Sequence, residues 1–600
     1  MHTLSVDFDV IVVGGGHAGI EAAWAASSMG SKTALISLDV SKIGTMPCNP
    51  AVGGVGKGHL VYEVSALGGL MPKLCTQTYL QARMLNTRKG PAVQGLRLQI
   101  DKCAYSSLSQ KMLAQKENLT LINGTVHELI VNEKQEIVGI KTDEGQVILS
   151  PCVVITTGTF LNGTIHIGLE RYSAGRRGEK AVDGLTPELK KCGLEMGRLK
   201  TGTPPRLLRE SLDFSKMQLQ EPDNLTYLFE FSPHKTVHKR ACYITHTNEK
   251  THAIIRDNLS RSALYSGNIK GIGPRYCPSI EDKIGRFPDK TGHQVFVEPE
   301  GANSNEIYPS GLSTSLPLDV QKAYIQSIAG FENAIITQPG YAIEYDFVYP
   351  HQLKHSLETK NVKGLFLAGQ INGTTGYEEA AAQGVIAGIN AHLISHSQAP
   401  FILSRTESYI GVMIDDLVTM SIDEPYRMFT SRAERRLLLR QDNAFLRLTE
   451  RAHHLGLIDC SFFAEFKKEK EYIQSTLASL QAGHNSTELL RLFGSDMDSF
   501  RSQISPYAKD CPSDRALNTI HAEIRYKPYL ARELQEVERL EHYRTLRIPA
   551  TLDYTGMPGL SKELQMKLTR NKPDTIAQAS LIPGMTPAAL SLLIIRLRKN

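Results

Sequence analysis

Residues 9–19 have the sequence DVIVVGGGHAG, and the alanine-rich segment IEAAWAA follows at 20–26. The apolar run is typical of a buried parallel strand, and Gly14, Gly16 and Gly19 fit the pattern G-x-G-x-x-G. The first glycine permits a tight turn, the second lets a pyrophosphate approach the backbone, and the third lets a helix pack on the strand. The N-terminus of that helix would offer free N–H groups to the phosphates. The segment therefore predicts a dinucleotide-binding strand, turn and helix.

A second predicted strand covers residues 31–38, and Asp39 stands at its end. An acidic side chain at this place usually binds the ribose hydroxyls of a dinucleotide. Any aspartate at a strand end has the same appearance, so both interpretations of Asp39 stay open. A glycine turn without a ligand is the alternative for the whole unit, and the flanking strand and helix argue against it.

Size and composition limit the class of protein. A chain of 600 residues predicts two to four domains, and 41% hydrophobic with 22% charged residues is typical of a soluble globular protein. The formal net charge of +5 permits a nucleic-acid partner only through a local basic surface. We expect no bilayer-spanning segment, no membrane partner and no targeting peptide, and therefore a cytoplasmic location. Nine cysteines without a C-x-x-C pair argue against a disulfide framework and against zinc, and no metal site is expected.

The chain changes character along its length. Predicted strands at 119–131, 137–142 and 147–155 indicate an antiparallel excursion whose last strand returns to the first sheet. From 201 to 286, short predicted strands at 241–245 and 252–255 alternate with polar turns, which indicates an inserted α/β domain.

The pattern of a strand, a glycine turn and a helix, typical of the cofactor domain, returns after residue 286. A strand at 362–368 runs into a glycine turn and a helix through Ala391, so residues 287–400 are expected to complete the cofactor domain. Strand patterns almost vanish after residue 401, which predicts an all-helical domain over 401–600. Its last helix has a leucine- and isoleucine-rich face at 590–597 and an N-cap at Thr586.

Residues 43–58, IGTMPCNPAVGGVGKG, contain too many glycines and prolines for a helix or strand. The segment is not a Walker A loop, because no Ser or Thr follows Lys57 and Ala51 stands at the first glycine position. We interpret it as a glycine-rich backbone lying along a flat cofactor, with Lys57 offering a positive charge. The loop also contains Cys48.

Along essentially its whole length the chain resembles the MnmG (GidA) family of FAD-dependent tRNA wobble-uridine modification enzymes. The resemblance rests on GGGHAG at 14–19, PCNPAVGGVGKG at 47–58, MLN at 84–86, KGPAV at 89–93, GPRYCPSIEDK at 273–283, GQ at 369–370, GYEEA at 376–380, FTSRAE at 429–434 and IPGMTPAA at 582–589. It implies an α/β fold of the two-dinucleotide flavoprotein type. A Rossmann-like FAD-binding domain would cover 1–200 and 287–400, the insertion at 201–286 would bind a nicotinamide nucleotide, and the helical domain at 401–600 would bind a GTPase partner and tRNA.

The resemblance also implies an activity. Together with an MnmE-type GTPase, in a heterotetramer of two plus two chains, members of the family add a carboxymethylaminomethyl or aminomethyl group to position 5 of the wobble uridine of certain tRNAs. FAD and NADH serve as cofactors, methylene-tetrahydrofolate is the one-carbon donor, and the enzyme is a homodimer.

Individual residues follow from the same motifs. The expected FAD contacts are Gly14, Gly15, Gly16, His17, Ala18, Gly19, Val126 and Gln370. The expected nicotinamide contacts are Gly273, Pro274, Arg275, Tyr276, Pro278, Ser279, Ile280, Glu281, Asp282, Lys283, Ile284, Gly285, Arg286 and Phe287.

Cys48 and Cys277 match the motif cysteines of the family, and we assign them as a catalytic pair without choosing the nucleophile. A thiolate that adds to carbon 6 of uracil would turn carbon 5 into a nucleophile. The alternative for each cysteine is a small buried apolar residue. Their Gly- and Pro-rich surroundings favour the chemical role, and for the other seven cysteines we prefer the alternative.

Several charged residues allow two interpretations. Glu378 and Glu379 are either proton donors or cofactor contacts, or they stabilise a helix N-terminus, which needs no ligand, and we assign neither a catalytic role. Two basic clusters are either RNA contacts or solvated surfaces. The first is a loop with Arg171, Arg176, Arg177 and Lys180, and the second, expected on a helix, has Arg432, Arg435, Arg436 and Arg440.

Three other functions compete with the main prediction. A folate- and FAD-dependent tRNA uridine 5-methyltransferase of the TrmFO type shares the cofactor domain but lacks a long helical C-terminal domain. A disulfide reductase needs a redox-active cysteine pair near the first glycine turn, and none is present. A non-catalytic flavin-binding scaffold is disfavoured by the two motif cysteines.

Overall fold

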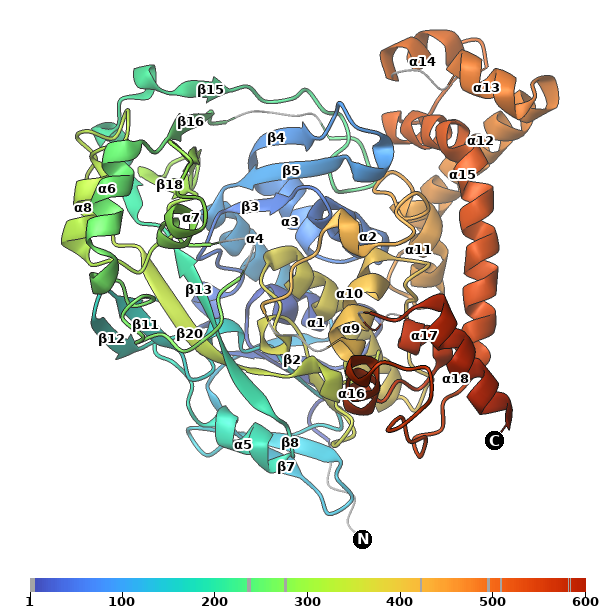
Figure 1. The fold of residues 1–600 in the computed structure, drawn as a ribbon, viewed down its shortest axis with the longest axis horizontal. Helices are drawn as coiled ribbons and strands as arrows, with labels where there is room; N and C mark the ends of the chain where they lie inside the picture. The colour runs from blue at the N-terminus through green and yellow to red at the C-terminus, as the bar shows by residue number, and fades with distance from the viewer. Residues whose placement is uncertain are drawn as a thin grey trace.

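The computed structural model describes residues 6–234, 239–274, 278–420, 424–493, 497–507, 510–580, 582 and 584–599. Two sheet regions and a set of helices make up the chain (Figure 1). The blue and yellow elements of the first region lie in the middle, the green second region lies to one side, and the orange and red helices lie on the other.

A parallel sheet of five strands forms the first region, in the order β21-β10-β1-β2-β6. Its strands are β1 (Val10–Val13), β2 (Thr33–Ser37), β6 (Leu119–Asn123), β10 (Val153–Ile155) and β21 (Leu365–Leu367). Every pairing in it is parallel, so the first nucleotide unit and the late strand meet in one sheet, as predicted.

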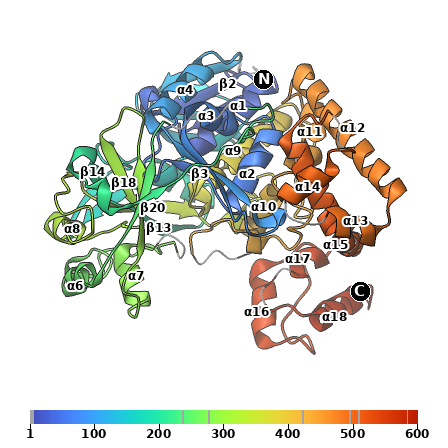
Figure 2. The ribbon, with the colours of Figure 1, turned by 90° about the horizontal axis from the view of Figure 1, so that it is seen from above.

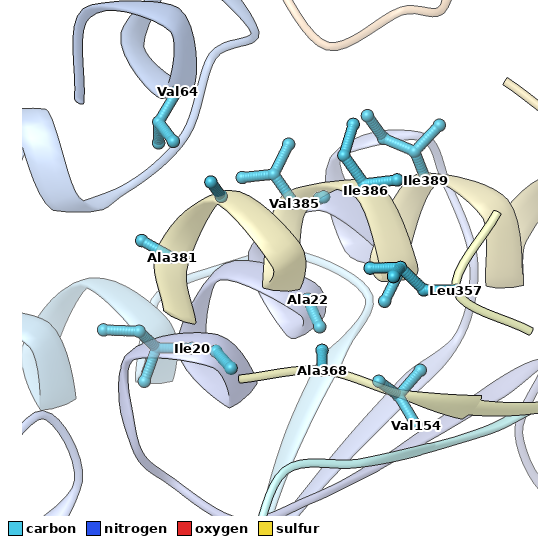
Figure 3. Close-up of a cluster of buried hydrophobic side chains, with 14 of the residues drawn as sticks. Ile20, Ala22, Val64, Val154, Leu357, Ala368, Ala381, Val385, Ile386 and Ile389 are labelled. Carbon is cyan, nitrogen blue, oxygen red and sulfur yellow. The ribbon is translucent and has the colours of Figure 1, made fainter. Parts of the chain in front are cut away.

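Two long buried helices pack together beside this sheet. Helix α1 (His17–Ser28) contacts α9 (Tyr377–Ser395), and Figure 3 shows the two helices side by side, with Ile20 and Ala22 on α1 and Val385 and Ile389 on α9 in one buried cluster. A Cβ atom on Gly384 would lie 2.2 Å from the carbonyl oxygen of Ala18. Glycine in α9 therefore lets the backbones of the two helices touch.

The predicted antiparallel excursion is confirmed. Strands β7 (Val126–Val131), β8 (Ile137–Thr142) and β9 (Val147–Leu149) form a three-stranded antiparallel sheet, after which β10 returns to the parallel sheet.

The glycine-rich loop is more regular than predicted. Residues Ala51–Gly53 form a short strand, β3, which pairs with β5 (Gly95–Ile100), and β5 pairs with β4 (Tyr79–Leu85). Helix α2 (Lys57–Ala66) starts at Lys57. The expectation of no strand or helix was wrong here, because a three-residue strand held by a neighbouring hairpin leaves no periodic pattern in the sequence.

A six-stranded sheet with its own hydrophobic core forms the second region. Its strands are β14 (Arg206–Leu208), β15 (Gln218–Gln220), β16 (Cys242–His246), β17 (Gln294–Pro299), β18 (Glu306–Ser310) and β19 (Ile336–Gln338), and its helices are α6 (Glu249–Asp257), α7 (Ile280–Arg286) and α8 (Leu318–Ile325). Strands on both sides of residue 286, the boundary expected from the sequence, belong to this one sheet. The domain limits of the sequence analysis stay a prediction.

The two regions are joined by long antiparallel strands. β13 (Met196–Thr203) pairs with β20 (Tyr341–Val348) over eight residues, and β11 (Thr164–Ile167) and β12 (Glu170–Ser173) extend this sheet.

The strand predicted at 252–255 is wrong, since these residues lie in α6. Asn248 caps this helix by accepting a hydrogen bond from the Thr251 N–H, and the Thr251 hydroxyl accepts one from the Asn248 N–H. The buried residues Thr251, His252 and Ile255 recur at helical spacing. The cap therefore determines a conformation that the short apolar run left ambiguous.

Beyond residue 400 the described residues form helices and turns, and no segment of them is a β-strand. The helices are α10 (Tyr409–Thr419), α11 (Ala444–His454), α12 (Cys460–Gly483), α13 (Ser486–Phe493), α14 (Met497–Ile504), α15 (Asp514–Thr545), α16 (Lys562–Asn571), α17 (Ile576–Ser580) and α18 (Pro587–Lys599). The predicted cap of α18 is confirmed, because the Thr586 hydroxyl accepts a hydrogen bond from the Ala589 N–H. Figure 2 shows α16, α17 and α18 together at one edge of the molecule, where α17 contacts α15. In the part of the chain described, no helix is both long and apolar enough to cross a bilayer.

Candidate functional site

A cavity of about 690 Å³ opens at the carboxyl ends of the parallel strands. Its walls combine the glycine turn after β1, the loop that contains Cys48, the second-region strands β17 and β18, and residues 427–429 of the helical region. Dinucleotides bind at this edge in open parallel sheets. All three regions of the chain therefore contribute to one site.

The turn role predicted for Gly14 and the packing role predicted for Gly19 are confirmed. A Cβ atom on Gly19 would lie 1.8 Å from the Gly14 carbonyl oxygen, so this position must stay bare for α1 to pack. Gly14 has φ +109°, a backbone conformation that favours glycine. A Cβ on Gly16 would meet nothing within 4 Å, because this residue faces open space. Gly16 is also the N-cap of α1 and supplies no side-chain cap, so the first N–H groups of the helix can serve an anion.

Unpartnered polar atoms in the wall indicate a polar ligand. His17 Nε2, Thr157 Oγ1 and Thr375 Oγ1 border the cavity and are buried without a hydrogen-bond partner. The His17 ring stacks on Tyr377 with centroids 4.4 Å apart, and burial lowers the pKa of His17 to about 4. A neutral ring with an open nitrogen, bare glycine backbone and free helix N–H groups fit the pyrophosphate and ribose parts of FAD.

Most of the predicted FAD contacts lie in this wall. Gly14, Gly15, Gly16, His17, Ala18, Val126 and Gln370 all line the cavity, whereas Gly19 serves the packing of α1. Asp39 lines it too, and its carboxylate also accepts a hydrogen bond of 2.8 Å from the Ser41 N–H. The role of Asp39 at a ribose stays a prediction.

Cys48 lies in the cavity wall between the two sheet regions. Its N–H donates to the Tyr377 hydroxyl at 2.8 Å, and its Sγ lies 3.1 Å from the Tyr308 hydroxyl. The buried Arg206 donates to the carbonyl oxygen of the preceding residue, Pro47, at 2.6 Å. The thiol is partly exposed and has a cation and a phenol nearby, which is the environment of a chemically active cysteine.

Lys57 is held in an ion-pair network. Its ammonium group lies 2.7 Å from Glu378 and 2.9 Å from Glu379, and all three side chains are buried. Glu378 also accepts from the Gly53 N–H, and Glu379 accepts from the Met428 N–H. Burial acts to raise the pKa of Glu378, but Lys57 outweighs it and lowers that pKa below its usual range. The two glutamates thus join α9 to α2 and to the helical region, which is more than the stabilisation of a helix terminus expected from the sequence.

The predicted nicotinamide segment divides into several environments. Arg275, Tyr276 and Cys277 lie outside the described residues. Pro274, Pro278 and Lys283 line the main cavity, and Gly273, Asp282 and Arg286 line a second cavity of about 370 Å³. Ser279 caps α7, while Ile280, Glu281 and Ile284 are buried in the second region and Phe287 is exposed. The last predicted contact, Gly285, lies within α7.

The basic clusters differ from each other. Arg440 is fully buried and paired with Asp442 and Glu523, so it is not available to RNA. The predicted helix through this cluster is wrong, since residues 433–440 form turns. In the other cluster Arg176 pairs with Glu179 and lines the cavity, and Arg171, Arg177 and Lys180 are exposed.

Sequence reasoning missed Arg206, Tyr308 and residues 427–429 as parts of the site. Arg206 follows two prolines at the start of the second region, which marks a fixed backbone but no chemistry. Tyr308 lies in an ordinary strand, β18. Only the fold brings these residues to the Cys48 loop.

The parallel sheet, the glycine turn and the cavity define a Rossmann-like dinucleotide-binding protein with a helical C-terminal region. Residues 9–399 match the family model "Glucose inhibited division protein A", and residues 536–600 match the model "tRNA modifying enzyme MnmG/GidA C-terminal helical bundle". The chain belongs to the GidA (MnmG) family, which confirms the resemblance drawn from its motifs.

Full-length relatives agree with this assignment. The tRNA uridine 5-carboxymethylaminomethyl modification enzyme MnmG of Thermodesulfovibrio yellowstonii is 49% identical to this chain, with 99% of the chain and 98% of the relative covered. The form I crystal structure of Aquifex aeolicus GidA matches with a TM-score of 0.90 at 46% identity, covering 98% of this chain and 100% of the other. The form II structure matches with a TM-score of 0.88 at 43% identity, covering 99% and 98%.

Proposed function

We propose that this protein is an FAD-dependent enzyme that modifies position 5 of the wobble uridine of tRNA. Membership of the GidA (MnmG) family supports the reaction class, and the relative from Thermodesulfovibrio yellowstonii carries such an activity in its name. The observation that carries the proposal is the single cavity in which Cys48 lies beside the glycine turn that fits FAD.

The residues that would hold FAD are those of the wall. The N–H groups at the start of α1 would bind the pyrophosphate beside Gly16, Asp39 would bind ribose, and Val126 and Gln370 would contact the rest of the cofactor. When bound, FAD supplies the redox step and, through its N5 atom, a carrier for a one-carbon unit. The backbones of α1 and α9 touch at the glycines of α9, and this close packing fixes the position of the α1 N-terminus in the cavity wall.

One of the two cysteines, Cys48 or Cys277, would act on the uracil ring. Addition of its sulfur to carbon 6 would make carbon 5 a nucleophile that forms a bond to the one-carbon unit, and elimination of the sulfur with loss of the carbon 5 proton would then restore the ring. The other cysteine would be the proton-transfer partner. The choice of nucleophile stays open between the two cysteines.

The remaining cofactors and partners belong to the same proposal. NADH would reduce FAD from the segment at 273–287, and methylene-tetrahydrofolate would donate the one-carbon unit. An MnmE-type GTPase would join a homodimer of this chain in a two-plus-two complex on tRNA in the cytoplasm. Residues 536–600 match the family's C-terminal helical bundle, and we propose that this end docks the GTPase.

Nucleoside mass spectrometry tests the function. A strain without this protein, complemented with the wild-type gene, should regain 5-carboxymethylaminomethyl- or 5-aminomethyl-modified wobble uridine in its tRNA. Complementation with Cys48→Ala should fail although the variant holds FAD, and Cys103→Ala, at an exposed helix position, should succeed.

Two outcomes would contradict the proposal. Normal modification with Cys48→Ala would remove Cys48 from the reaction. A loss of 5-methyluridine instead of a wobble modification would favour the folate-dependent methyltransferase.

A further inference from the structure

We propose that Tyr308 and Arg206 are positioning residues that hold the sulfur of Cys48 as a reactive thiolate. This inference rests on the proposed function only for the reaction in which the thiolate takes part. Whether the sulfur is ionised is a separate property and can be measured by itself. Tyr308 comes from β18 and Arg206 from β14, so the second sheet region would prepare a cysteine that the first region supplies.

The phenol is the direct contact. Tyr308 is buried, and its hydroxyl lies 3.1 Å from Cys48 Sγ. A hydroxyl that donates to an ionised sulfur stabilises the charged form. After the thiol has lost its proton to solvent in the cavity, the Tyr308 hydroxyl donates a hydrogen bond to the ionised Cys48 sulfur.

Arg206 supplies the positive charge. Its guanidinium lies 4.7 Å from the centre of the Tyr308 ring and donates to the carbonyl of Pro47 at 2.6 Å, which places it against both partners. Burial acts to lower the pKa of Arg206, but attraction to Glu300, Tyr308 and Cys48 raises it above its usual range. The arginine is therefore charged at pH 7.

Arg206 reaches the Cys48 loop although it also pairs with Glu300. Its Nε donates to one Glu300 oxygen at 2.6 Å, while the other oxygen pairs with Lys102, which in turn lies 3.5 Å from Glu306. A different nitrogen, Nη2, donates to the Pro47 carbonyl, so this end of the guanidinium lies toward Cys48. A nearby cation favours a thiolate strongly in a partly buried site, where water screens it little.

Two further phenols interact with Cys48 and stay neutral at pH 7. Tyr377 of α9 accepts from the Cys48 N–H, and burial raises its pKa well above the usual value. Burial also raises the pKa of Tyr341 of β20, which interacts electrostatically with Cys48 and Arg206. Neither phenol therefore opposes the charge of Arg206.

The experiment is alkylation of the FAD-loaded full-length protein with iodoacetamide from pH 5 to 10, with each cysteine peptide quantified by mass spectrometry. The exposed Cys103 serves as an internal reference in every sample. Tyr308→Phe removes only the hydroxyl, and Arg206→Lys keeps the charge but loses the forked contacts. Tyr324→Phe is the matched control, since Tyr324 is buried in the same region and its hydroxyl contacts the Leu312 carbonyl instead.

We expect the Cys48 profile of Tyr308→Phe to move up by about one pH unit, so that its alkylation slows about tenfold at pH values well below the wild-type midpoint. The Cys103 peptide and the Tyr324→Phe protein should follow the wild type. A Cys48 profile of Tyr308→Phe that coincides with the wild type would overturn the inference, and this variant decides it even if Arg206→Lys fails to fold. The Cys48→Ala nucleoside test decides the proposed function separately, because alkylation does not depend on tRNA.

Discussion

Gly16 and Gly19 stand three residues apart in the nucleotide turn, and a methyl group has different consequences at the two positions. At Gly19 it would collide with the Gly14 carbonyl oxygen, whereas at Gly16, with φ −78°, it has space and an ordinary backbone conformation. Gly19→Ala should therefore lower the free energy of unfolding by about 3 kcal/mol. Gly16→Ala should change stability by about 0.5 kcal/mol at most, but weaken FAD binding because the methyl occupies the space left for the pyrophosphate.

Thermal unfolding and titration of the apoproteins with FAD measure these two effects. Equal loss of stability in the two variants would contradict the packing argument. Unchanged FAD affinity in Gly16→Ala would contradict the placement of the pyrophosphate.

Buried histidines give the protein a predicted acid sensitivity. Burial lowers the pKa of His17 and His59 to about 4, whereas an unfolded chain protonates histidine near pH 6.5. The unfolded state therefore binds more protons between these values, and the folded state loses stability as the pH falls from 6.5 to 4.

His59→Gln removes one of these groups. Between pH 7 and pH 5 the variant should lose about 2 kcal/mol less unfolding free energy than the wild type, whatever the substitution costs at pH 7. Urea unfolding at the two pH values measures the difference. An equal loss in the two proteins would show that His59 does not titrate as the structure indicates.

Sequence patterns predicted the residues whose role is local and missed those whose role depends on distant partners. The glycines of the turn act on their own strand and helix, so the spacing sufficed. Arg440 looked like a surface cation, but its partner Glu523 is 83 residues away. Tyr308 likewise becomes part of the site only through its contact with Cys48, 260 residues away.

At the scale of elements, Lys57 joins the N-termini of α2 and α9 beside the cavity. Its removal would leave Glu378 and Glu379 buried without a counter-charge, which costs far more than the loss of an exposed pair. Lys57→Met should lower the unfolding free energy by about 3 kcal/mol or more, and Glu379→Gln in the same chain should recover part of it.

The matched control is Lys191→Met. Lys191 lies 2.6 Å from Glu188 but is 74% exposed, so its loss should cost about 0.5 kcal/mol or less. Chemical denaturation of the four proteins measures these differences. Similar costs at Lys57 and Lys191 would contradict the network.

The sequence correctly predicted elements that have a strong apolar periodicity or a glycine turn at one end. It did not predict the short elements. β1, α1 and α9 have long apolar runs next to glycine turns and are confirmed. The segment 252–255 contains too few apolar residues to separate strand from helix, and the deciding cap at Asn248 lies outside it. β3 exists because β5 pairs with it, a contact that crosses more than forty residues.

At the scale of the whole molecule, the helices beyond residue 400 belong to three different cores. Phe401, Tyr409, Phe445 and Phe466 are buried in the core of the nucleotide-binding region. A second cluster lies among α12 to α15, and a third, from Ile548 to Leu593, belongs to the last helices alone. A change from strands to helices in the sequence therefore does not mark where one core ends.

These cores predict opposite results for two truncations. A chain that ends at residue 545, with α15, keeps the first core and the cofactor cavity, and it loses the last helices with their own core and the contact of α17 with α15. It should bind FAD like the full chain, and its unfolding temperature should lie within a few degrees of that of the full chain. It should nevertheless lose its complex with the GTPase partner and its activity on tRNA, since the docking role is proposed for this end.

A chain that ends at residue 400 exposes the apolar surface that α10 and α11 cover, and it should aggregate. The ratio of flavin to protein absorbance and gel filtration with the GTPase measure both. A complex that survives truncation at 545 would place the GTPase elsewhere on the molecule, and a soluble FAD-loaded chain ending at 400 would contradict the shared core.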